Sequence, residues 1–155
     1  MDIYQTKNFR VAAADKPHIT RRDGGHIVII PKKKVVERTK FSPKVAIEFI
    51  RLSMIVGEAF KIVMNRNGVD LERINYQDNG NWSVFKPEGP HFHLHLYGRA
   101  KIQKYGQATY FPHIKDNPKF YEKNERLNKK DIADLKKEIQ KLFKTKKYDD
   151  RNWHL

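Results

Sequence analysis

The sequence predicts a single α+β domain in which a long helix lies across one face of a β-sheet. An apolar stretch at 26–31, bounded by glycines and ended by a proline, is typical of a central strand. From His91 onward, histidines alternate with large apolar residues, which is the two-residue period of another strand. Between them, Ser42-Pro43 opens a helical pattern that closes near Gly68. A chain of 155 residues is long enough for one domain with a hydrophobic core, and no linker divides it.

The remaining strands are short and are separated by turn residues. Strands are predicted at 1–5 and 8–13, and residues 21–25 form a turn that leads into 26–31. A further strand is predicted at 71–77, before a loop rich in glycine, proline and asparagine. That loop delivers the chain to the histidine strand, which we expect to run from residue 91 to about 100.

Two helices are predicted from their caps and apolar faces. The first spans about 42–67, with serine as the N-cap and a broad apolar face that would pack on the sheet. Asn128 caps the second helix, and Asp131 stands in the capping-box position. The second helix has a narrow apolar stripe made of Ile132, Leu135, Ile139 and Leu142. It belongs to a basic C-terminal extension, about 101–155, which follows a core of about 3–100.

Composition and charge narrow the possible classes of protein. No apolar run approaches the ~20 residues of a membrane span, and no signal-peptide pattern is present. The chain has no cysteine, which excludes disulfides and thiolate metal sites, so we expect a cytoplasmic protein without membrane contact. The net charge of +14 predicts a polyanionic partner, either a nucleotide or nucleic acid. The eight lysines and three acids of 129–147 are equally typical of a solvated helix face.

His91, His93 and His95 would share one face of their strand, backed by apolar residues on the other face. Three interpretations are open for this row. It is a structural feature, or a metal site completed by a ligand such as His26 or His113, or a centre for phosphoryl or nucleotidyl transfer. The last interpretation accounts best for several imidazoles in register. One neutral imidazole can attack phosphorus while a second handles the proton of the leaving group.

Residues 91–97 read His-Phe-His-Leu-His-Leu-Tyr, a full match to the pattern His-φ-His-φ-His-φ-φ, in which φ is apolar. Upstream, residues 24–32 read Gly-Gly-His-Ile-Val-Ile-Ile-Pro-Lys and precede the helix that begins at Ser42-Pro43. Asn79-Gly80 lies shortly before the histidines. In these motifs and their order, over roughly residues 3–100, the chain resembles the histidine triad (HIT) superfamily.

This resemblance implies an antiparallel sheet, a homodimer, and hydrolysis or transfer at the α-phosphate of a nucleotide through a nucleotidyl-histidine. It assigns His93 as the nucleophile, His95 to the proton of the leaving group, and His91 to orienting the row. It implies no required cofactor, although a divalent cation such as Mg²⁺ is an open expectation as a companion of the substrate. Gly98-Arg99 and the aromatic and basic residues up to Tyr121 also resemble bacterial diadenosine tetraphosphate hydrolase-like members.

The resemblance also suggests which residues bind the nucleotide. Asn79 or Asn81 would contact a phosphate, and Ile27, on an early apolar strand, would hold the base. Lys86 lies where many members carry Gln-Ser or Gln-Thr, and as a cation it would serve the phosphate instead. His18 lies at the position of the acidic residue that binds the ribose hydroxyls. The cations expected to steer a polyanionic substrate are Lys32, Lys33, Lys34, Lys86 and Arg99.

Three functions are compatible with these residues. The first is hydrolysis of dinucleoside polyphosphates, such as diadenosine tetraphosphate, or of other nucleotide conjugates. The second is hydrolysis of adenylated nucleic-acid ends, for which a basic surface would grip the phosphodiester backbone. The third is nucleotide binding without catalysis on the same fold.

Overall fold

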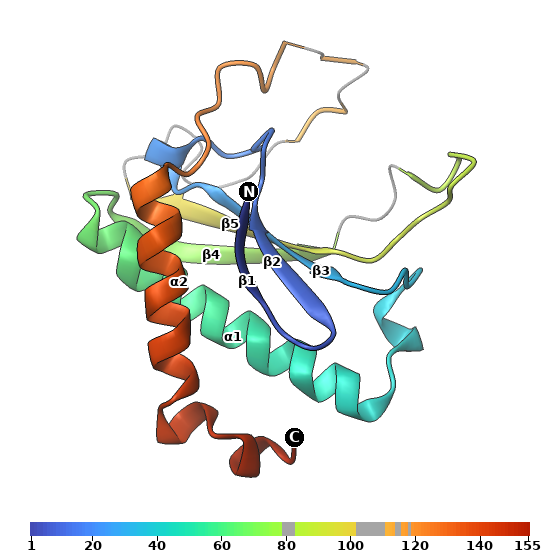
Figure 1. Cartoon of the computed structure of the whole chain (residues 1–155). Helices are drawn as coiled ribbons and strands as arrows, with labels where there is room; N and C mark the ends of the chain where they lie inside the picture. Colours follow the sequence, from blue (N-terminus) through green and yellow to red (C-terminus); the bar gives the residue numbers. More distant parts are fainter. Residues whose placement is uncertain (79–82, 102–110, 114–115, 118) are drawn as a thin grey trace.

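In the part of the chain that the structure describes, five strands form one antiparallel sheet, which confirms the predicted α+β class (Figure 1). The computed structural model describes residues 1–78, 83–101, 111–113, 116–117 and 119–155. The strands lie in the order β1-β2-β3-β5-β4. Their bounds are β1 Asp2–Gln5, β2 Phe9–Ala13, β3 His26–Pro31, β4 Leu71–Asp78 and β5 Leu94–Ala100.

The centre of the sheet is the pairing of β3 with β5. Val28 lies opposite His95, and Ile27 lies opposite Leu96. Directly opposed residues of an antiparallel pair share a face, so this register separates two surfaces. Ile27 and Leu96 are fully buried in the hydrophobic core, whereas Val28 and His95 lie on the other face. The histidine face and the core face are therefore fixed together.

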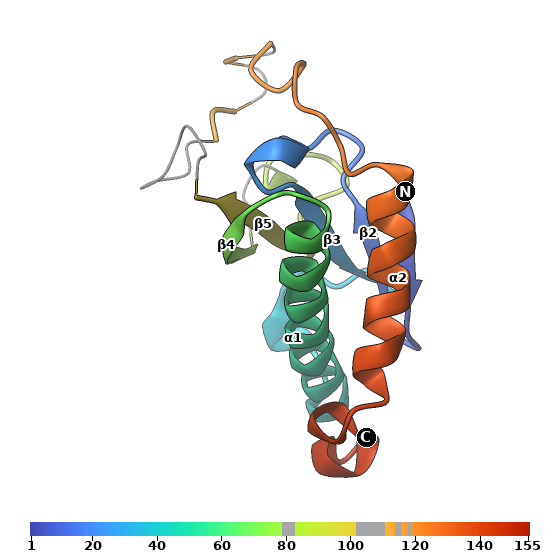
Figure 2. The ribbon, with the colours of Figure 1, turned by 90° about the vertical axis from the view of Figure 1, so that its left-hand side faces the viewer.

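Two helices cover the core face of the sheet. Figures 1 and 2 show α1 (Pro43–Arg66) and α2 (Lys129–Phe143) side by side, with the segment before α2 passing over the opposite side of the sheet. The capping box predicted for α2 is present, because Asn128 and Asp131 exchange side-chain and backbone hydrogen bonds. In the described part of the chain, no helix is long and apolar enough to cross a membrane.

Two glycines allow the loop before β3 to approach the end of β5. Gly24 has φ +130°, and a Cβ placed on it would lie 2.2 Å from the carbonyl carbon of Gly98. Only glycine adopts this conformation without strain and leaves room for the neighbouring backbone. The contact continues through Gly25, whose carbonyl oxygen accepts a hydrogen bond from the N–H of Gly98 at 3.0 Å. The end of the histidine strand is thus in direct backbone contact with the loop that leads into β3.

The histidine strand is shorter than predicted. We expected it to begin at residue 91, but β5 begins at Leu94. The N–H of Phe92 donates to the carbonyl oxygen of Val35, at 2.6 Å, in the loop that follows β3. The backbone around the first two histidines is therefore held by a loop, and only His95 stands within the sheet.

Candidate active site

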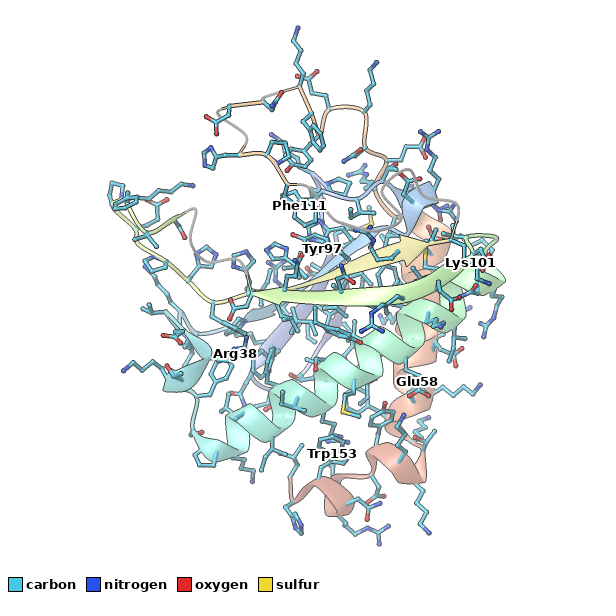
Figure 3. The ribbon with its side chains drawn as sticks, turned by 180° about the vertical axis from the view of Figure 1, so that it is seen from behind. Arg38, Glu58, Tyr97, Lys101, Phe111 and Trp153 are labelled. Carbon is cyan, nitrogen blue, oxygen red and sulfur yellow. The ribbon has the colours of Figure 1, made fainter. Side chains whose placement is uncertain are left out.

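The candidate site lies on the face of the sheet away from the helices. His95, Tyr97 and Arg99 project from this face of β5, and His26 projects from the same face of β3 opposite Tyr97. Figure 3 shows Tyr97 pointing from the sheet toward Phe111, on the side opposite α1. The rings of Tyr97 and Phe111 lie 4.6 Å apart between centroids. An aromatic layer therefore covers part of the histidine face.

The three imidazoles of the row are consecutive neighbours. The ring centroids of His91 and His93 are 5.0 Å apart, and those of His93 and His95 are 4.5 Å apart. Exposure decreases along the row, because His91 is exposed, His93 is half-buried and His95 is buried. The row therefore leads from solvent into the interior, with His93 at the boundary.

His93 is oriented by the backbone of its neighbour. Its Nδ1 lies 3.0 Å from the carbonyl oxygen of His91. A carbonyl oxygen only accepts hydrogen bonds, so this contact requires the proton of a neutral His93 to be on Nδ1. The Nε2 atom then carries a lone pair. This is the tautomer that a nucleophile needs.

His95 is held in the opposite tautomer through a second histidine. The N–H of His18 donates to Nδ1 of His26 at 3.2 Å, so the proton of a neutral His26 is on Nε2. That Nε2 lies 2.8 Å from Nδ1 of His95 and donates to it. Nδ1 of His95 is an acceptor, and its own proton is therefore on Nε2. Two adjacent histidines thus present a lone pair and an N–H.

Burial keeps the imidazoles of His26 and His95 neutral. Desolvation, reinforced by the charges of His93 and His18, lowers the pKa of His95 to about 3. Burial and the neighbouring His95 also lower the pKa of His26 well below its ordinary value. Neutral imidazole is the form that the hydrogen bonds require, so the electrostatics and the geometry agree.

His18 packs against the buried side of the row. Its Nδ1 lies 2.9 Å from the hydroxyl oxygen of Tyr97, and its ring lies 5.8 Å from that of His95 and 4.8 Å from that of Tyr121. Burial, together with the charge of His93, lowers the pKa of His18. We expected His18 to stand in for a ribose-binding acid, and that role stays a prediction; in this structure its imidazole packs against the rings of His95 and Tyr121.

A basic cavity of about 360 Å³ opens beside His91. The side chain of Lys34 reaches the carbonyl oxygen of Glu88, which joins the loop after β3 to the loop before the histidines. Burial, followed by the charges of His93 and Lys34, lowers the pKa of His91. The cavity is lined by Ile30, Pro31, Lys32, Lys33, Lys34, Val35, Glu88, His91 and Phe92.

The structure corrects one predicted nucleotide contact. Ile27 is 0% exposed and belongs to the core under the helices, so its side chain is on the wrong face to hold a base. Its neighbours Val28 and Ile30 point to the histidine side, because strand residues alternate between faces. Ala12, opposite Val28, adds a small side chain there. These three residues form an apolar strip beside His95.

The other predicted contacts lie in different places around the row. Lys86 is exposed in the loop before the histidines, close enough for its charge to act on His91. Arg99 is on the histidine face beyond Tyr97 and is buried, and desolvation lowers its pKa. Asn79 and Asn81 lie outside the described residues.

Sequence reasoning missed two residues of the site. His26 was considered only as a metal ligand, although its place at the start of an apolar strand was the signal for a buried imidazole. Gln77 lies opposite His95 on β4, and its Oε1 is buried and has no hydrogen-bond partner among the described residues. A buried amide oxygen costs free energy unless another group donates a hydrogen bond to it. Within the described ranges, no group of three or more histidine and acidic side chains is arranged to hold a metal ion.

Several solved structures with a similar fold are histidine triad proteins. A zinc-bound histidine triad family protein from Mycobacterium smegmatis is 22% identical, with a TM-score of 0.56 over 91% of this chain and 84% of that one. A hypothetical histidine triad nucleotide-binding protein from Sulfolobus tokodaii is 16% identical, with a TM-score of 0.59 over 96% and 88%. A histidine triad protein from Marinobacter aquaeolei is 12% identical, with a TM-score of 0.58 over 92% and 87%.

No protein-family model and no curated protein matches the sequence. At these identities, the likeness establishes the fold. The chain has the α+β fold of histidine triad proteins, and the histidine row lies on the helix-free face of its sheet.

Proposed function

We propose that this chain, with its histidine triad fold, is a hydrolase or transferase that acts at the α-phosphate of a nucleotide. The observation that carries the proposal is the pair of opposite tautomers on adjacent imidazoles. Nε2 of His93 offers a lone pair at the solvent boundary, and Nε2 of His95 offers a proton, with ring centroids 4.5 Å apart. A phosphate held between them would meet a nucleophile and a hydrogen-bond donor together.

In the first step, Nε2 of His93 attacks the α-phosphorus and the bond to the leaving oxygen breaks. The His93 ring gains positive charge as the nucleotidyl-histidine forms, and the carbonyl oxygen of His91 stabilises that charge through Nδ1–H. Because His95 is neutral, it would act on the phosphoryl or leaving oxygen as a hydrogen-bond donor. In the second step, water attacks phosphorus and the bond between phosphorus and Nε2 of His93 breaks. The nucleoside monophosphate and the neutral imidazole are released, and the proton of the water passes to solvent.

Dinucleoside polyphosphates are the proposed substrates. The strip of Ala12, Val28 and Ile30 would receive one nucleoside beside His95. The lysine-lined cavity beside His91 would receive the remaining phosphates. A divalent cation such as Mg²⁺ would arrive bound to the polyphosphate, because phosphate oxygens are natural ligands of such a cation.

The proposal is tested with diadenosine tetraphosphate as the substrate. The wild-type protein should release AMP and ATP, and rapid quenching in an alkaline denaturant, in which the phosphorus–nitrogen bond is stable, should trap a protein adduct heavier by one adenylyl group. His93→Ala should lower kcat by at least about 10³-fold and abolish the adduct, because the nucleophile is gone. His154→Ala, which removes an exposed imidazole from the C-terminal tail, is the matched control and should keep full activity.

Two outcomes would redirect the assignment. If an adenylated oligonucleotide assayed in parallel is turned over faster, with KM rising steeply with salt, the substrate is a nucleic-acid end. If nucleotides bind but neither turnover nor adduct is found, the protein is a nucleotide-binding module and the catalytic proposal is wrong.

We also propose that the protein works as a homodimer through β4. This strand is at the edge of the sheet and is twice as long as β1, the other edge strand, with 8 residues against 4. Beside it, a groove of about 520 Å³ between α1 and β4 is lined by apolar residues that include Met54 and Tyr76, together with the charged residues Glu58, Lys61, Glu72, Arg73 and Lys147. An unpaired edge next to an exposed apolar patch is suited to pairing with a second copy.

A further inference from the structure

The C-terminal extension is fastened to the segment that carries His18. The side-chain amide of Asn124 donates to the carbonyl oxygens of Pro17 and His18, at 2.9 and 3.1 Å. Two more hydrogen bonds join Glu125 to this segment, one from its N–H to Thr20 Oγ1 at 2.9 Å and one from the N–H of Arg21 to its carbonyl oxygen at 2.8 Å. Residues 17–21 are therefore bound edge to edge to residues 124–125.

The start of α2 anchors the same segment. The guanidinium group of Arg21 donates to both carboxylate oxygens of Asp131, at 2.6 and 3.0 Å. Asp131 is fully buried and also caps α2 through Asn128. A bidentate pair of this kind fixes orientation as well as distance. The C-terminal helix and the loop before β3 are thus held in one relative position.

One peptide group connects this fastening to the imidazoles. The carbonyl oxygen of Pro17 and the N–H of His18 belong to the same peptide unit, which is trans. In a trans peptide the C=O and N–H point in opposite directions. The amide of Asn124 therefore donates to the carbonyl oxygen of this peptide, while its N–H donates to Nδ1 of His26 at 3.2 Å.

We propose that Asn124 is a positioning residue that fixes the tautomer of His95 through this peptide and His26, an inference that rests on the proposed function. If the peptide rotates, Nδ1 of His26 loses its donor and the Nδ1–H tautomer becomes accessible. His26 Nε2 would then accept from His95, whose Nε2 would carry a lone pair in place of its proton. The hydrogen-bond donor would be lost from the site while every histidine remained in place.

Imidazole tautomers are measured directly by long-range ¹⁵N–¹H correlation spectra of uniformly labelled protein. In the wild type, His26 and His95 should both show the Nε2–H pattern. Asn124→Asp keeps the shape but removes both donors, so the two patterns should become mixtures. Its kcat for diadenosine tetraphosphate should fall about tenfold, the size typical of a residue that acts through another, while KM stays within about twofold. Asn124→Gln, which keeps the amide, should recover part of both.

The matched control is Thr20→Val. It removes the neighbouring hydrogen bond to Glu125 at the same fastening but leaves the Pro17–His18 peptide untouched, so tautomers and kcat should stay at wild-type values. If Asn124→Asp does not fold, Asn124→Ala provides the same readout.

The proposal is overturned if the Asn124 variants keep both Nε2–H patterns, or if Thr20→Val mixes the tautomers to the same extent. Failure of the proposed function would appear separately, as wild-type protein without turnover, because the spectra report the tautomers without any substrate.

Discussion

Two neighbouring histidines have opposite tautomers here because their Nδ1 atoms meet different partners. Nδ1 of His93 meets a backbone carbonyl oxygen, and Nδ1 of His95 meets the imidazole of His26. The alternating sequence is sufficient to predict a row of imidazoles on one side of the chain. It cannot predict the asymmetry, because the carbonyl is oriented by the turn before β5 and His26 comes from a strand distant in sequence.

The buried imidazoles predict how stability depends on pH. His26 and His95 have pKa values below the ordinary 6.5 when folded, so below that pH the unfolded chain binds more protons than the folded one. Stability is fully present above pH 6.5 and is lost as pH falls toward the folded pKa values. Each imidazole contributes a slope of up to about 1.4 kcal/mol per pH unit.

Urea unfolding between pH 7 and about 5.5 measures this slope, above the range in which ordinary carboxylates titrate. His26→Phe should give a slope shallower by about one proton, because one buried imidazole is removed. Equal slopes for wild type and His26→Phe would contradict the assignment of a neutral, buried His26.

At the scale of elements, the sequence predicts which helices and strands form better than it predicts which of their faces is buried. The strand at 26–31, the helix at 42–67 and the cap at Asn128 are all confirmed. The error at Ile27 arose because residues 27–30 are all apolar, so no alternation indicates which face is buried. The pairing with β5 decides this, and it places Ile27 rather than Val28 under the helices.

The glycine contact between the loop before β3 and the end of β5 gives a prediction at this scale. Gly24→Ala should lower the free energy of unfolding by on the order of 3 kcal/mol, because it combines an unfavourable φ with a clash against backbone that cannot move aside. Gly68→Ala is the matched control. Gly68 also has positive φ, +82°, but a Cβ there meets nothing within 4 Å.

Chemical denaturation of both variants separates conformational strain from steric clash. Gly68→Ala should cost only about 1 kcal/mol. Equal losses of unfolding free energy for the two variants would show that the close approach to Gly98 adds no steric cost.

At the scale of the whole molecule, the C-terminal extension is the part whose contacts the sequence predicts least well. Residues 101–121 show no period, so their relation to the sheet could not be predicted. The cap at Asn128 locates the start of α2, but nothing in the local pattern indicates that Asn124 reaches Pro17 and His18. Such contacts depend on the path of the chain between elements, which composition and periodicity do not encode.

The proposed dimer gives a prediction for the assembled protein. Size-exclusion chromatography with light scattering should give the mass of two chains for the wild type. Met54→Glu places a charge in the groove beside β4 and should shift the protein to monomer, because the charge would be desolvated at the interface. Val36→Glu changes another exposed apolar residue, on the loop after β3, and should leave the dimer intact. A monomeric wild type at high concentration would contradict the proposal.

The fastening at Asn124 has a consequence for the order in which the site matures on the ribosome. Asn124 is translated after all the histidines of the row, and after β3 and β5, which carry His26 and His95. A nascent chain stopped before it can pair β3 with β5 and assemble the imidazoles, but the carbonyl oxygen of Pro17 then lacks its donor. The tautomers of the row would therefore be fixed last during synthesis. An incomplete chain would have its histidines in place before their protons are on the nitrogens that the proposed reaction needs.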